Sequence, residues 1–510
     1  MSVAPTIILG PPGTGKTTKL LSYIDDLLGS GTNPENIGYV SFTRKAVQEA
    51  RDRAVAKFKL PVEKFRYFRT LHSLALENTI LDTSKLMDDE KFAEFSEIMG
   101  LRVEIKDVED DETGMRMYNN KYLNILQNAR HRGVPLRTEY NAGGYDFPFT
   151  ALYKFAEGYT KFKQARKYFD FTDMIEEYIR EGNDIALDAL FIDEAQDLNY
   201  LQLQMKEKLQ GNALKTYVAG DDDQAIYSWS GVEPRHFIEM TGNVVNLQQS
   251  YRCAQSIHRV AMRIRNRIKF KRDKTWSPRQ DEGKIVRHAD LYFAKQTAHG
   301  KWIMMGRTKN ICGRLKQFCR EKGFYYATRY GNSVSEKRLD ALQTWFDLQQ
   351  GETVTLAALN KMYFYISPKD RIKRGKKEQL KKYLKESSAA KKELVSIEKV
   401  QKDWGLLVDT SVSWFDLFTN YPYEDKLYLE SMTRRGEDIF SKPRIRIETI
   451  HGMKGGEEDN VLLLLDMGKY AYDAYKRDDD DEHRVWYVAV TRARNELHLV
   501  DPNSDYGYRI

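Results

Sequence analysis

A glycine-rich loop near the N-terminus constrains this chain more than any other feature of its sequence. The apolar run IIL at residues 7–9 is followed by GPPGTGKTT at residues 10–18, and an amphipathic stretch then extends from Lys19 to Leu28. This pattern predicts a strand, a loop and a helix in succession. Glycines allow backbone N–H groups to approach phosphate oxygens, and the N-terminus of the following helix favours negative charge. The sequence therefore predicts a phosphate-binding loop.

The spacing within the loop narrows the ligand to a nucleoside triphosphate. Residues 10–17 fit the pattern G-x-x-x-x-G-K-[ST], which binds the phosphates of ATP or GTP when a strand precedes it and a helix follows. In that pattern Lys16 reaches the β- and γ-phosphates, and the Thr17 hydroxyl ligates Mg²⁺. The candidate nucleotide-binding residues are Gly10, Pro11, Gly13, Thr14, Gly15, Lys16, Thr17 and Thr18. The motif leaves open which nucleotide-driven reaction the protein performs.

A pair of adjacent carboxylates follows a second apolar run. The sequence FIDEAQD at residues 191–197 places Asp193 and Glu194 where a predicted strand ends, which is where open parallel sheets bind ligands. Asp193 suits the Mg²⁺ shell, and Glu194 suits the base that orients and deprotonates an attacking water. An acidic pair at the surface after a buried strand is the alternative. The phosphate-binding loop in the same chain favours the catalytic interpretation of this pair. The adjacent carboxylates favour hydrolysis by water over phosphoryl transfer to a small molecule.

Strand and helix patterns alternate along the rest of the chain. Two successive strand–helix units near the N-terminus favour a parallel sheet, and a second set of such patterns begins after Val245. We predict an α/β fold with two parallel-sheet core domains, each interrupted by a mainly helical insertion. The expected boundaries are 1–80 and 166–245 for the first core, 81–165 for its insertion, 246–345 and 442–510 for the second core, and 346–441 for its lysine-rich insertion.

Composition excludes several other classes of protein. No run approaches the 18 apolar residues of a membrane span, and the N-terminus lacks the pattern of a secretory signal. The three cysteines, Cys253, Cys312 and Cys319, cannot form a disulfide framework, and no Cys/His cluster has zinc spacing. We therefore expect a cytoplasmic setting, in a bacterial cell or a virus-infected host.

Positive charge is concentrated in one segment. Between Lys361 and Lys402 there are 14 Lys or Arg residues against 5 Asp or Glu, whereas the net charge of the whole chain is only +7. Two interpretations stay open for this segment: a solvated helical face, or a patch that contacts nucleic-acid phosphates. The acidic run at 478–482 is expected to be an exposed turn before a helix.

Ten sequence blocks, in order, resemble the superfamily-one helicases of the UvrD/Rep/PcrA type. They are GPPGTGKTT (10–18), YVSFTRKAVQEAR (39–51), RTLHS (69–73), FDFTDM (169–174), FIDEAQD (191–197), VAGDDDQAIYSWSG (218–231), NLQQSYRC (246–253), GRTKN (306–310), IETIHGMKGGEEDNVLLL (447–464) and WYVAVTRARNELHLV (486–500). The two insertions share no such block. The resemblance implies two RecA-like core domains and an ATP site with Mg²⁺.

The resemblance also implies roles for residues around the nucleotide. Gln224 is similar to the residue that couples the γ-phosphate to the DNA site, and Tyr251 is similar to an aromatic that stacks on adenine. Arg252 and Arg492 resemble two arginines that contact the γ-phosphate, and Glu457 resembles a carboxylate that contacts the ribose. Guanidinium groups stabilise charge on the transferred phosphoryl group. A surface salt bridge is the alternative for either arginine considered alone.

A further set of residues resembles the family's contacts to nucleic acid. Phe42, Tyr227 and Trp229 resemble aromatics on which bases stack, and stacking is indifferent to base sequence. Core packing is the alternative for each ring, but Phe42 and Trp229 each sit where a predicted strand gives way to a loop, which favours an accessible ring. The backbone-contacting positions are Thr70, His72, Thr449 and His451. Structural hydrogen bonds are the alternative for the two histidines.

The resemblance implies an ATP-dependent DNA helicase or translocase that moves 3′→5′ on single-stranded DNA. The implied partners are single-stranded DNA, duplex junctions and replication or repair proteins, with no membrane. Three alternatives stay open: a translocase that displaces bound proteins with little unwinding, an RNA-directed helicase, and a nucleotide-switched binding module. Family members carry an adenine-reading glutamine upstream of the glycine-rich loop. No such segment fits here, so preference for ATP over other triphosphates stays open. Ten residues follow Val500, so we expect no fused nuclease.

Overall fold

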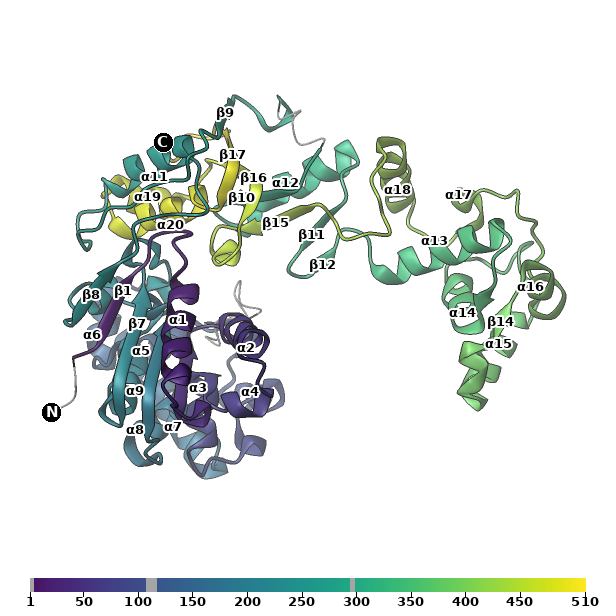
Figure 1. The fold of residues 1–510 in the computed structure, drawn as a ribbon. Coiled ribbons are helices and arrows are strands. Elements are labelled where there is room, and N and C mark those ends of the chain that lie inside the picture. The colour runs from purple at the N-terminus through teal and green to yellow at the C-terminus, as the bar shows by residue number, and fades with distance from the viewer. Residues whose placement is uncertain (1–3, 107–116, 294–298) are drawn as a thin grey trace. The chain divides into compact units, whose positions relative to one another are not determined.

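The computed structural model describes residues 4–106, 117–293 and 299–510 (Figure 1). The N-terminal elements are β1 (Thr6–Leu9), α1 (Lys16–Gly29), β2 (Ile37–Ser41), α2 (Arg44–Phe58), β3 (Phe68–Thr70), α3 (Leu71–Glu77), α4 (Asp89–Met99), β4 (Ile105–Lys106), β5 (Met117–Tyr118), α5 (Lys121–Arg132), α6 (Leu136–Ala142), α7 (Phe149–Arg166), α8 (Phe171–Glu181), β6 (Leu187–Asp193), α9 (Tyr200–Gly211), β7 (Ala213–Gly220), α10 (Pro234–Ile238), β8 (Asn243–Asn246), α11 (Gln255–Arg265) and β9 (Lys284–His288).

The remaining elements complete the second half of the chain. They are β10 (Trp302–Gly306), α12 (Lys309–Lys322), β11 (Tyr326–Thr328), β12 (Gly331–Asn332), α13 (Glu336–Gln349), β13 (Val354–Thr355), α14 (Leu356–Phe364), α15 (Lys376–Glu386), β14 (Leu394–Val395), α16 (Ile397–Trp404), α17 (Trp414–Leu417), α18 (Tyr423–Arg435), β15 (Ile445–Thr449), β16 (Glu458–Leu464), α19 (Lys469–Lys476), α20 (Asp480–Val490) and β17 (Ala493–Val500). Among the described helices, none is long and apolar enough to cross a membrane.

The first sheet has six strands in the order β3-β2-β6-β7-β1-β8. All five pairs of neighbouring strands in it are parallel, with Leu9 opposite Gly220 and Ser41 opposite Asp193. All residues of β2 and nearly all of β6 are buried, as expected for strands covered on both faces. Because the strands are parallel, the loops after β1, β2, β3, β6 and β7 all emerge at one edge of the sheet.

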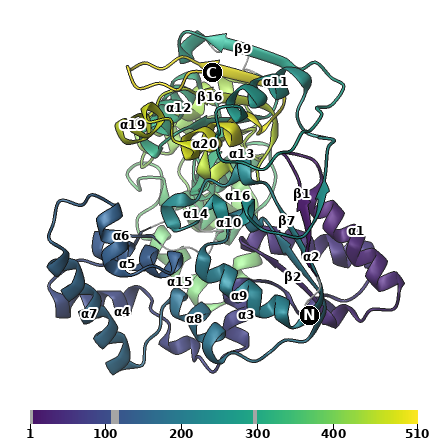
Figure 2. The ribbon, with the colours of Figure 1, turned by 90° about the vertical axis from the view of Figure 1, so that its left-hand side faces the viewer.

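Helices cover both faces of this sheet (Figures 1 and 2). Alternate strand residues point to opposite faces, so Ile8, Tyr39 and Phe191 pack with α1 and α2. On the other face, neighbouring strand residues such as Ile7 and Ile192 pack with α3, α8 and α9. The sheet is thus the middle layer of a three-layer α/β core.

The first helical insertion has an aromatic core of its own. Helices α4, α5 and α7 and the two-residue strands β4 and β5 enclose it. Its buried side chains include Phe92, Phe95, Leu123, Phe155 and Tyr159. The described residues between 81 and 165 thus have the mainly helical character that the sequence predicted.

The second sheet has the order β12-β11-β15-β10-β16-β17-β9. The pairs β10–β16 and β11–β15 are parallel, and β11–β12 is antiparallel. Residues 346–441 are mainly helical, with only the short antiparallel pair β13–β14. The predicted α/β class, with parallel strand pairs and helical insertions, is therefore confirmed.

The chain groups into two compact units. One comprises Met1–Arg287, Thr449–Asp459 and Leu465–Ile510, and the other comprises His288–Glu448 and Asn460–Leu464. These units divide the chain at points other than the expected boundaries, because residues 246–287 and 465–510 group with the N-terminal part. The division into two cores at residue 245 stays a prediction.

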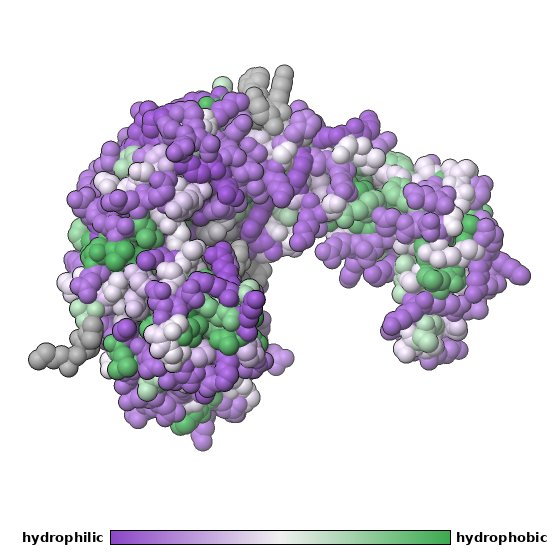
Figure 3. Space-filling model, in the orientation of Figure 1, coloured by the Kyte–Doolittle hydropathy of each residue, from purple (hydrophilic) through white to green (hydrophobic). Residues whose placement is uncertain are grey.

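Surface polarity and cysteine state agree with the composition. The face drawn in Figure 3 is mostly hydrophilic, and its apolar patches are small and separated. Cys253, Cys312 and Cys319 are all buried and free.

The acidic run at 478–482 differs in part from the expected exposed turn: the Asp479 side chain caps α20, and Asp480, Asp481 and Glu482 form the first turn of that helix. Acidic groups there are stabilised by the helix dipole.

Candidate functional site: a nucleotide cavity

The loop between β1 and α1 keeps its backbone open to a ligand. Gly13 and Gly15 have φ values of +71° and +81°, which residues with side chains rarely adopt. A Cβ built on Gly13 would lie 2.2 Å from the Cβ of Arg252, so a side chain has no space there. Gly15 is the N-cap of α1 and offers no side-chain cap. The first N–H groups of α1 are therefore directed at the position of an anion.

Three hydroxyl and carboxylate groups meet behind this loop. The Thr17 hydroxyl donates a hydrogen bond of 2.9 Å to Asp193 Oδ2, and the buried Tyr39 hydroxyl donates one of 2.7 Å to the same oxygen. Hydroxyl and carboxylate oxygens are the ligands that Mg²⁺ prefers. The close contact of Thr17 with Asp193, beside a phosphate-binding loop, fits this ion.

Glu194 adopts a strained backbone conformation. Its φ of 54° and ψ of 41° lie in the left-handed region, which costs a non-glycine residue about 1–3 kcal/mol. Its carboxylate lies 3.6 Å from the Lys16 ammonium and accepts a hydrogen bond of 2.6 Å from Gln196. The strain therefore directs this carboxylate towards the lysine of the glycine-rich loop.

The two adjacent carboxylates have opposite pKa shifts. Burial raises the pKa of Asp193, and the neighbouring Glu194 charge raises it further. Burial also acts to raise the pKa of Glu194, but the positive charges of Lys16 and Lys454 outweigh it and leave this pKa below its ordinary value. Glu194 is thus ionised at neutral pH and able to accept a proton.

Cationic side chains from three other segments, at Arg252, Lys454 and Arg492, reach the same cavity. Arg492 is only 1% exposed, and it donates hydrogen bonds to Gln224 Oε1 at 2.8 Å and to the Gly456 carbonyl at 3.1 Å. Burial, together with the charge of Arg252, lowers the pKa of Arg492 to about 9. A buried guanidinium with a lowered pKa is stabilised when an anion approaches it. Phosphate is such an anion.

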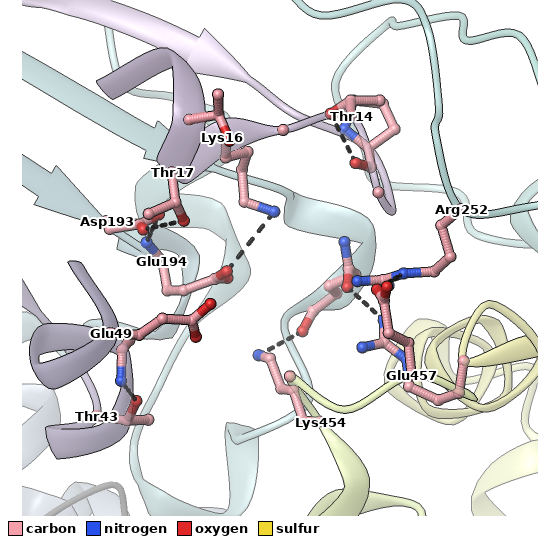
Figure 4. Close-up of a pocket in the computed structure, with 18 of the residues that line it drawn as sticks. Thr14, Lys16, Thr17, Thr43, Glu49, Asp193, Glu194, Arg252, Lys454 and Glu457 are labelled. Carbon is pink, nitrogen blue, oxygen red and sulfur yellow. Dashed lines mark hydrogen bonds and ion pairs between the residues drawn. The ribbon is translucent and has the colours of Figure 1, made fainter. Parts of the chain in front are cut away.

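Arg252 and Lys454 are paired with carboxylates. Arg252 forms an ion pair with Glu457. Lys454 donates to Asp197 at 2.5 Å and to the Gln224 carbonyl at 2.7 Å. Figure 4 shows Lys16, Thr17, Asp193 and Glu194 on one side of the pocket, with Arg252, Lys454 and Glu457 on the other.

These groups line one cavity of about 550 Å³. Tyr251 also lines it, with its side chain 68% exposed and its backbone N–H donating 2.8 Å to the Gly13 carbonyl. The structure thus brings together predicted residues from six sequence blocks. Those that line the cavity are Pro11, Gly13, Thr14, Gly15, Lys16, Thr17, Thr18, Asp193, Glu194, Gln224, Tyr227, Tyr251, Arg252, Glu457 and Arg492. Gly10 precedes them, and its carbonyl accepts a hydrogen bond of 3.1 Å from Lys16.

A buried acidic triplet holds Gln224 in place. Asp221, Asp222 and Asp223 are fully buried and paired with Lys274, and Asp223 also pairs with Arg265 at 2.6 Å. The Gln224 amide donates to Asp221 at 2.5 Å. These carboxylates are therefore neutralised by protein cations and serve to orient Gln224.

The residues expected to contact nucleic acid differ in accessibility. Phe42 is 3% exposed and Tyr227 is 2% exposed, and their ring centroids lie 5.4 Å apart within the core. The expectation that Phe42 has an accessible ring is wrong for this structure, because the ring packs in the core cluster beside Tyr227. Trp229 is only partly buried, in a 3₁₀ turn at Ser228–Ser230.

The backbone-contacting candidates lie at the ends of strands. Thr70 caps α3 by accepting a hydrogen bond from the Ser73 N–H, and the ring of His72 meets Phe171 edge-on at 5.6 Å. Thr449 ends β15 and accepts from the Gly452 N–H at 3.1 Å. His451 is buried beside Tyr227, with ring centroids 6.5 Å apart.

Sequence reasoning missed several residues of the cavity. Thr43, Glu49 and Arg53 line it from α2 and the loop before it, and Lys454 lines it from the loop before β16. Tyr39 is the unpredicted partner of Asp193. Most of these residues belong to the sequence blocks quoted above, but no spacing rule marked them individually.

The parallel sheet, with its glycine-rich loop at the carboxyl end of β1, defines a nucleotide-binding protein of the P-loop class. Comparison of the sequence with models of protein families identifies the protein class more specifically. The model of the UvrD/REP helicase N-terminal domain matches residues 2–244, and that of the UvrD-like helicase C-terminal domain matches residues 304–503. The chain belongs to this UvrD/Rep-like helicase family, whose cores are RecA-like.

Curated relatives are similar at low identity. The ATP-dependent DNA helicase Rep of Escherichia coli (strain K12) is 26% identical over 277 residues, which cover 50% of this chain and 40% of that protein. Rep of Buchnera aphidicola subsp. Schizaphis graminum is 22% identical, covering 97% of this chain and 90% of the relative. The ATP-dependent DNA helicase PcrA of Leuconostoc citreum is 26% identical, covering 58% and 41%. The match to E. coli Rep thus spans less than half of that relative.

Proposed function

We propose that this protein is an ATP-dependent DNA helicase or translocase that moves 3′→5′ on single-stranded DNA. The observation that carries the proposal is the single cavity that Lys16 and Glu194 share with Arg252 and Arg492. The similarity to proteins named ATP-dependent DNA helicase Rep and PcrA supports the substrate. The polarity rests on the resemblance of the sequence blocks, as do replication or repair proteins as partners.

In the proposed reaction the cavity binds ATP with its phosphates on the glycine-rich loop. Lys16 contacts the β- and γ-phosphates, Tyr251 stacks on the base, and Glu457 contacts the ribose. Bound Mg²⁺, held by Thr17 and Asp193, would neutralise charge on the phosphate oxygens. Glu194, ionised because Lys16 and Lys454 lower its pKa, accepts the proton of the attacking water.

The proposed role of Arg252 and Arg492 is to stabilise the charge of the transferred phosphoryl group. Neither is free in this structure: Arg252 pairs with Glu457, and Arg492 with Gln224. A γ-phosphate competes for both guanidinium groups, so nucleotide binding changes the hydrogen bonding of Gln224. Gln224 lies five residues before Trp229 in one loop. We propose that this loop couples ATP hydrolysis to the binding of single-stranded DNA.

The proposed single-strand contacts are Trp229 with the backbone-contacting Thr70, His72, Thr449 and His451. Stacking of a base on an exposed aromatic contributes about 1–3 kcal/mol without regard to sequence. Phe42 and Tyr227 offer bases no ring face in this conformation. Their use as stacking residues requires the loops after β2 and β7 to rearrange.

The lysine-rich insertion is the proposed second contact to nucleic acid. Nine cations in it are exposed and form no ion pair with the described residues: Lys369, Lys373, Arg374, Lys381, Lys385, Lys391, Lys392, Lys402 and Arg435. Four of the nine lie on α15 or in the 3₁₀ turn Ala389–Lys392 that follows it, within a segment of local charge +9. Such a concentration of cations favours phosphate binding over a merely solvated face.

The deciding experiment measures ATP turnover and strand displacement together. We expect single-stranded DNA to stimulate ATP hydrolysis, and a 3′-tailed duplex to be unwound while a 5′-tailed duplex is not. Stimulation without displacement, together with removal of a bound protein from the strand, would identify a translocase instead. Stimulation by RNA alone would reassign the substrate. Absence of stimulation by either nucleic acid would overturn the proposal.

A further inference from the structure

Helix α5 of the first insertion is hydrogen-bonded to the backbone of the loop that carries Trp229. Three successive carbonyl groups of this loop each accept a hydrogen bond from a different α5 side chain. Because a carbonyl oxygen only accepts, His131 Nδ1 must carry the proton in its contact. The three pairs are Arg132 Nη2 with the Ser228 carbonyl (3.2 Å), Asn128 Nδ2 with the Trp229 carbonyl (3.3 Å) and His131 Nδ1 with the Ser230 carbonyl (3.1 Å).

The spacing of these three residues along α5 allows them to contact the loop together. Residues 128, 131 and 132 are spaced i, i+3 and i+4, so their side chains share one face of the helix. The loop approaches that face closely at Gly231, whose φ is +88°. A Cβ on Gly231 would lie 2.7 Å from the Cβ of His131. The loop backbone at Gly231 therefore packs directly against α5, with no space for a side chain between them.

Helix α5 is itself fixed to the core. Arg130 forms ion pairs with three carboxylates of the α8 region: Asp170 at 3.0 Å, Asp173 at 2.6 Å and Glu176 at 2.7 Å. Asp170 is buried, and such charge-assisted bonds are strong when desolvated. Helix α8 in turn packs against the sheet through Ile175 and Tyr178. The α5 face is thus a rigid support.

The other end of the same loop lies in the nucleotide cavity. Gln224 and Tyr227 both line the cavity, and the Lys454 ammonium lies 4.6 Å from the centre of the Tyr227 ring. Tyr227 meets Trp229 edge-on, with centroids 6.1 Å apart. The segment from Gln224 to Ser230 therefore contacts the cavity at its start and α5 at its end.

We propose that Asn128, His131 and Arg132 are positioning residues that hold Trp229 in the orientation needed to stack on a base. This inference rests on the proposed DNA function and extends it to the insertion, which acts as a fixed support for the stacking loop. The ring of Trp229 is partly exposed, and its direction follows from its backbone. Fixing three consecutive carbonyls fixes that backbone.

The test measures binding of labelled oligo(dT) by fluorescence anisotropy, beside basal ATPase without DNA. We expect Arg132→Met and His131→Ala each to weaken oligo(dT) binding about threefold to tenfold, the effect of losing one hydrogen bond. Basal ATPase should not change. His131→Gln retains a donor towards the Ser230 carbonyl and should restore most of the affinity. Asn128→Ala provides a further variant should Arg132→Met fail to fold.

Lys121→Met is the matched control for Arg132→Met. Both remove one positive charge from α5, but Lys121 lies at the N-terminal end of the helix, away from the residues that grip the loop. If the two variants weaken binding equally, general electrostatic attraction explains the loss and the positioning role is overturned. We expect less than a twofold effect for Lys121→Met.

A double-mutant cycle with Trp229→Ala separates positioning from direct contact. Trp229→Ala should itself weaken binding roughly tenfold to hundredfold. In that background Arg132→Met and His131→Ala should have no further effect, because no ring is left to position. A persistent effect would overturn the inference while leaving the DNA function intact. If Trp229→Ala binds oligo(dT) normally, both the inference and the proposed single-strand site fail.

Discussion

The guanidinium of Arg492 donates a hydrogen bond of 2.8 Å to the side-chain oxygen of Gln224. The amide of the same glutamine donates to Asp221 at 2.5 Å, and Asp221 is paired with the buried Lys274. The amide oxygen and the amide nitrogen of Gln224 therefore each have a hydrogen-bond partner. In the proposed reaction a γ-phosphate competes with Gln224 for Arg492, so this hydrogen bond is the proposed connection between the nucleotide and the loop that carries Trp229.

Arg492→Lys should abolish most hydrolysis without abolishing nucleotide binding. Lysine retains the positive charge but lacks the planar guanidinium group, whose several N–H donors can contact a phosphate and Gln224 at the same time. Arginines in this role contribute about 10³-fold or more to turnover, and we expect a kcat loss of about that size at saturating single-stranded DNA. Binding of a fluorescent ATP analogue should change only a few-fold. Arg494→Lys is the control, since Arg494 lines the cavity but pairs only weakly with Glu457, at 3.7 Å. Wild-type turnover by Arg492→Lys would refute the assignment.

Lys16→Ala and Glu194→Gln should fail at different steps. Lys16→Ala removes the phosphate contact and should weaken binding of the ATP analogue. Glu194→Gln keeps the shape of the site but removes the base, so it should bind ATP normally while kcat falls about 10²–10⁴-fold. Glu49→Gln controls for the loss of a carboxylate from the same cavity. An equal loss in Glu49→Gln and Glu194→Gln would show that Glu194 is not the specific base.

The positions of the nucleotide-binding residues were predictable because local rules determine them. A strand, a glycine-rich loop and a helix place Lys16 and Thr17, and a strand end places Asp193. The packing of Phe42 was not predictable, because a ring at the end of a strand can turn to either side, and the tertiary contact with Tyr227 decides. The grip of Arg132 on the Ser228 carbonyl joins residues 96 positions apart, and no periodicity in the sequence reports such a contact.

Tyr39→Phe should weaken the response of the site to Mg²⁺. The substitution removes only the hydroxyl that donates 2.7 Å to Asp193, the proposed metal ligand. Groups that orient a metal ligand typically contribute 10–100-fold to metal affinity, and we expect about a tenfold higher Mg²⁺ concentration for half-maximal hydrolysis. Mn²⁺ binding with ADP, measured by electron paramagnetic resonance, should weaken in parallel. Tyr217→Phe on the neighbouring strand β7 removes a hydroxyl that does not contact Asp193 and should match the wild type. Unchanged Mn²⁺ binding in Tyr39→Phe would rule out the positioning role.

Neutralising the lysine-rich insertion should reduce the salt dependence of DNA binding. Each phosphate contact to a single strand contributes about −0.7 to the slope of log affinity against log salt. The triple substitution Lys381→Gln, Lys385→Gln and Lys392→Gln should therefore make the slope shallower by about 2, with basal ATPase unchanged. The matched control removes three exposed cations from the α19 region, with Lys469→Gln, Lys476→Gln and Arg477→Gln. If both triple variants shift the slope alike, the insertion is only a solvated face.

Acidification should destabilise the protein through His131. Burial and the charge of Arg130 lower the pKa of His131 to about 4, although the Ser230 carbonyl, Asp170 and Glu176 oppose the shift. The ordinary value is about 6.5, so below that pH the unfolded chain binds a proton that the folded protein excludes. Stability from the neutral ring is present above pH 6.5 and is lost as the pH falls towards 4. At 1.36 kcal/mol per pKa unit the loss between pH 7 and pH 5 is about 2 kcal/mol. Urea unfolding at both pH values should show this loss in the wild type and a loss about 2 kcal/mol smaller in His131→Gln. Identical pH dependence in the two proteins would mean that the ring is already solvated and that the α5 contact with Ser230 is open in solution.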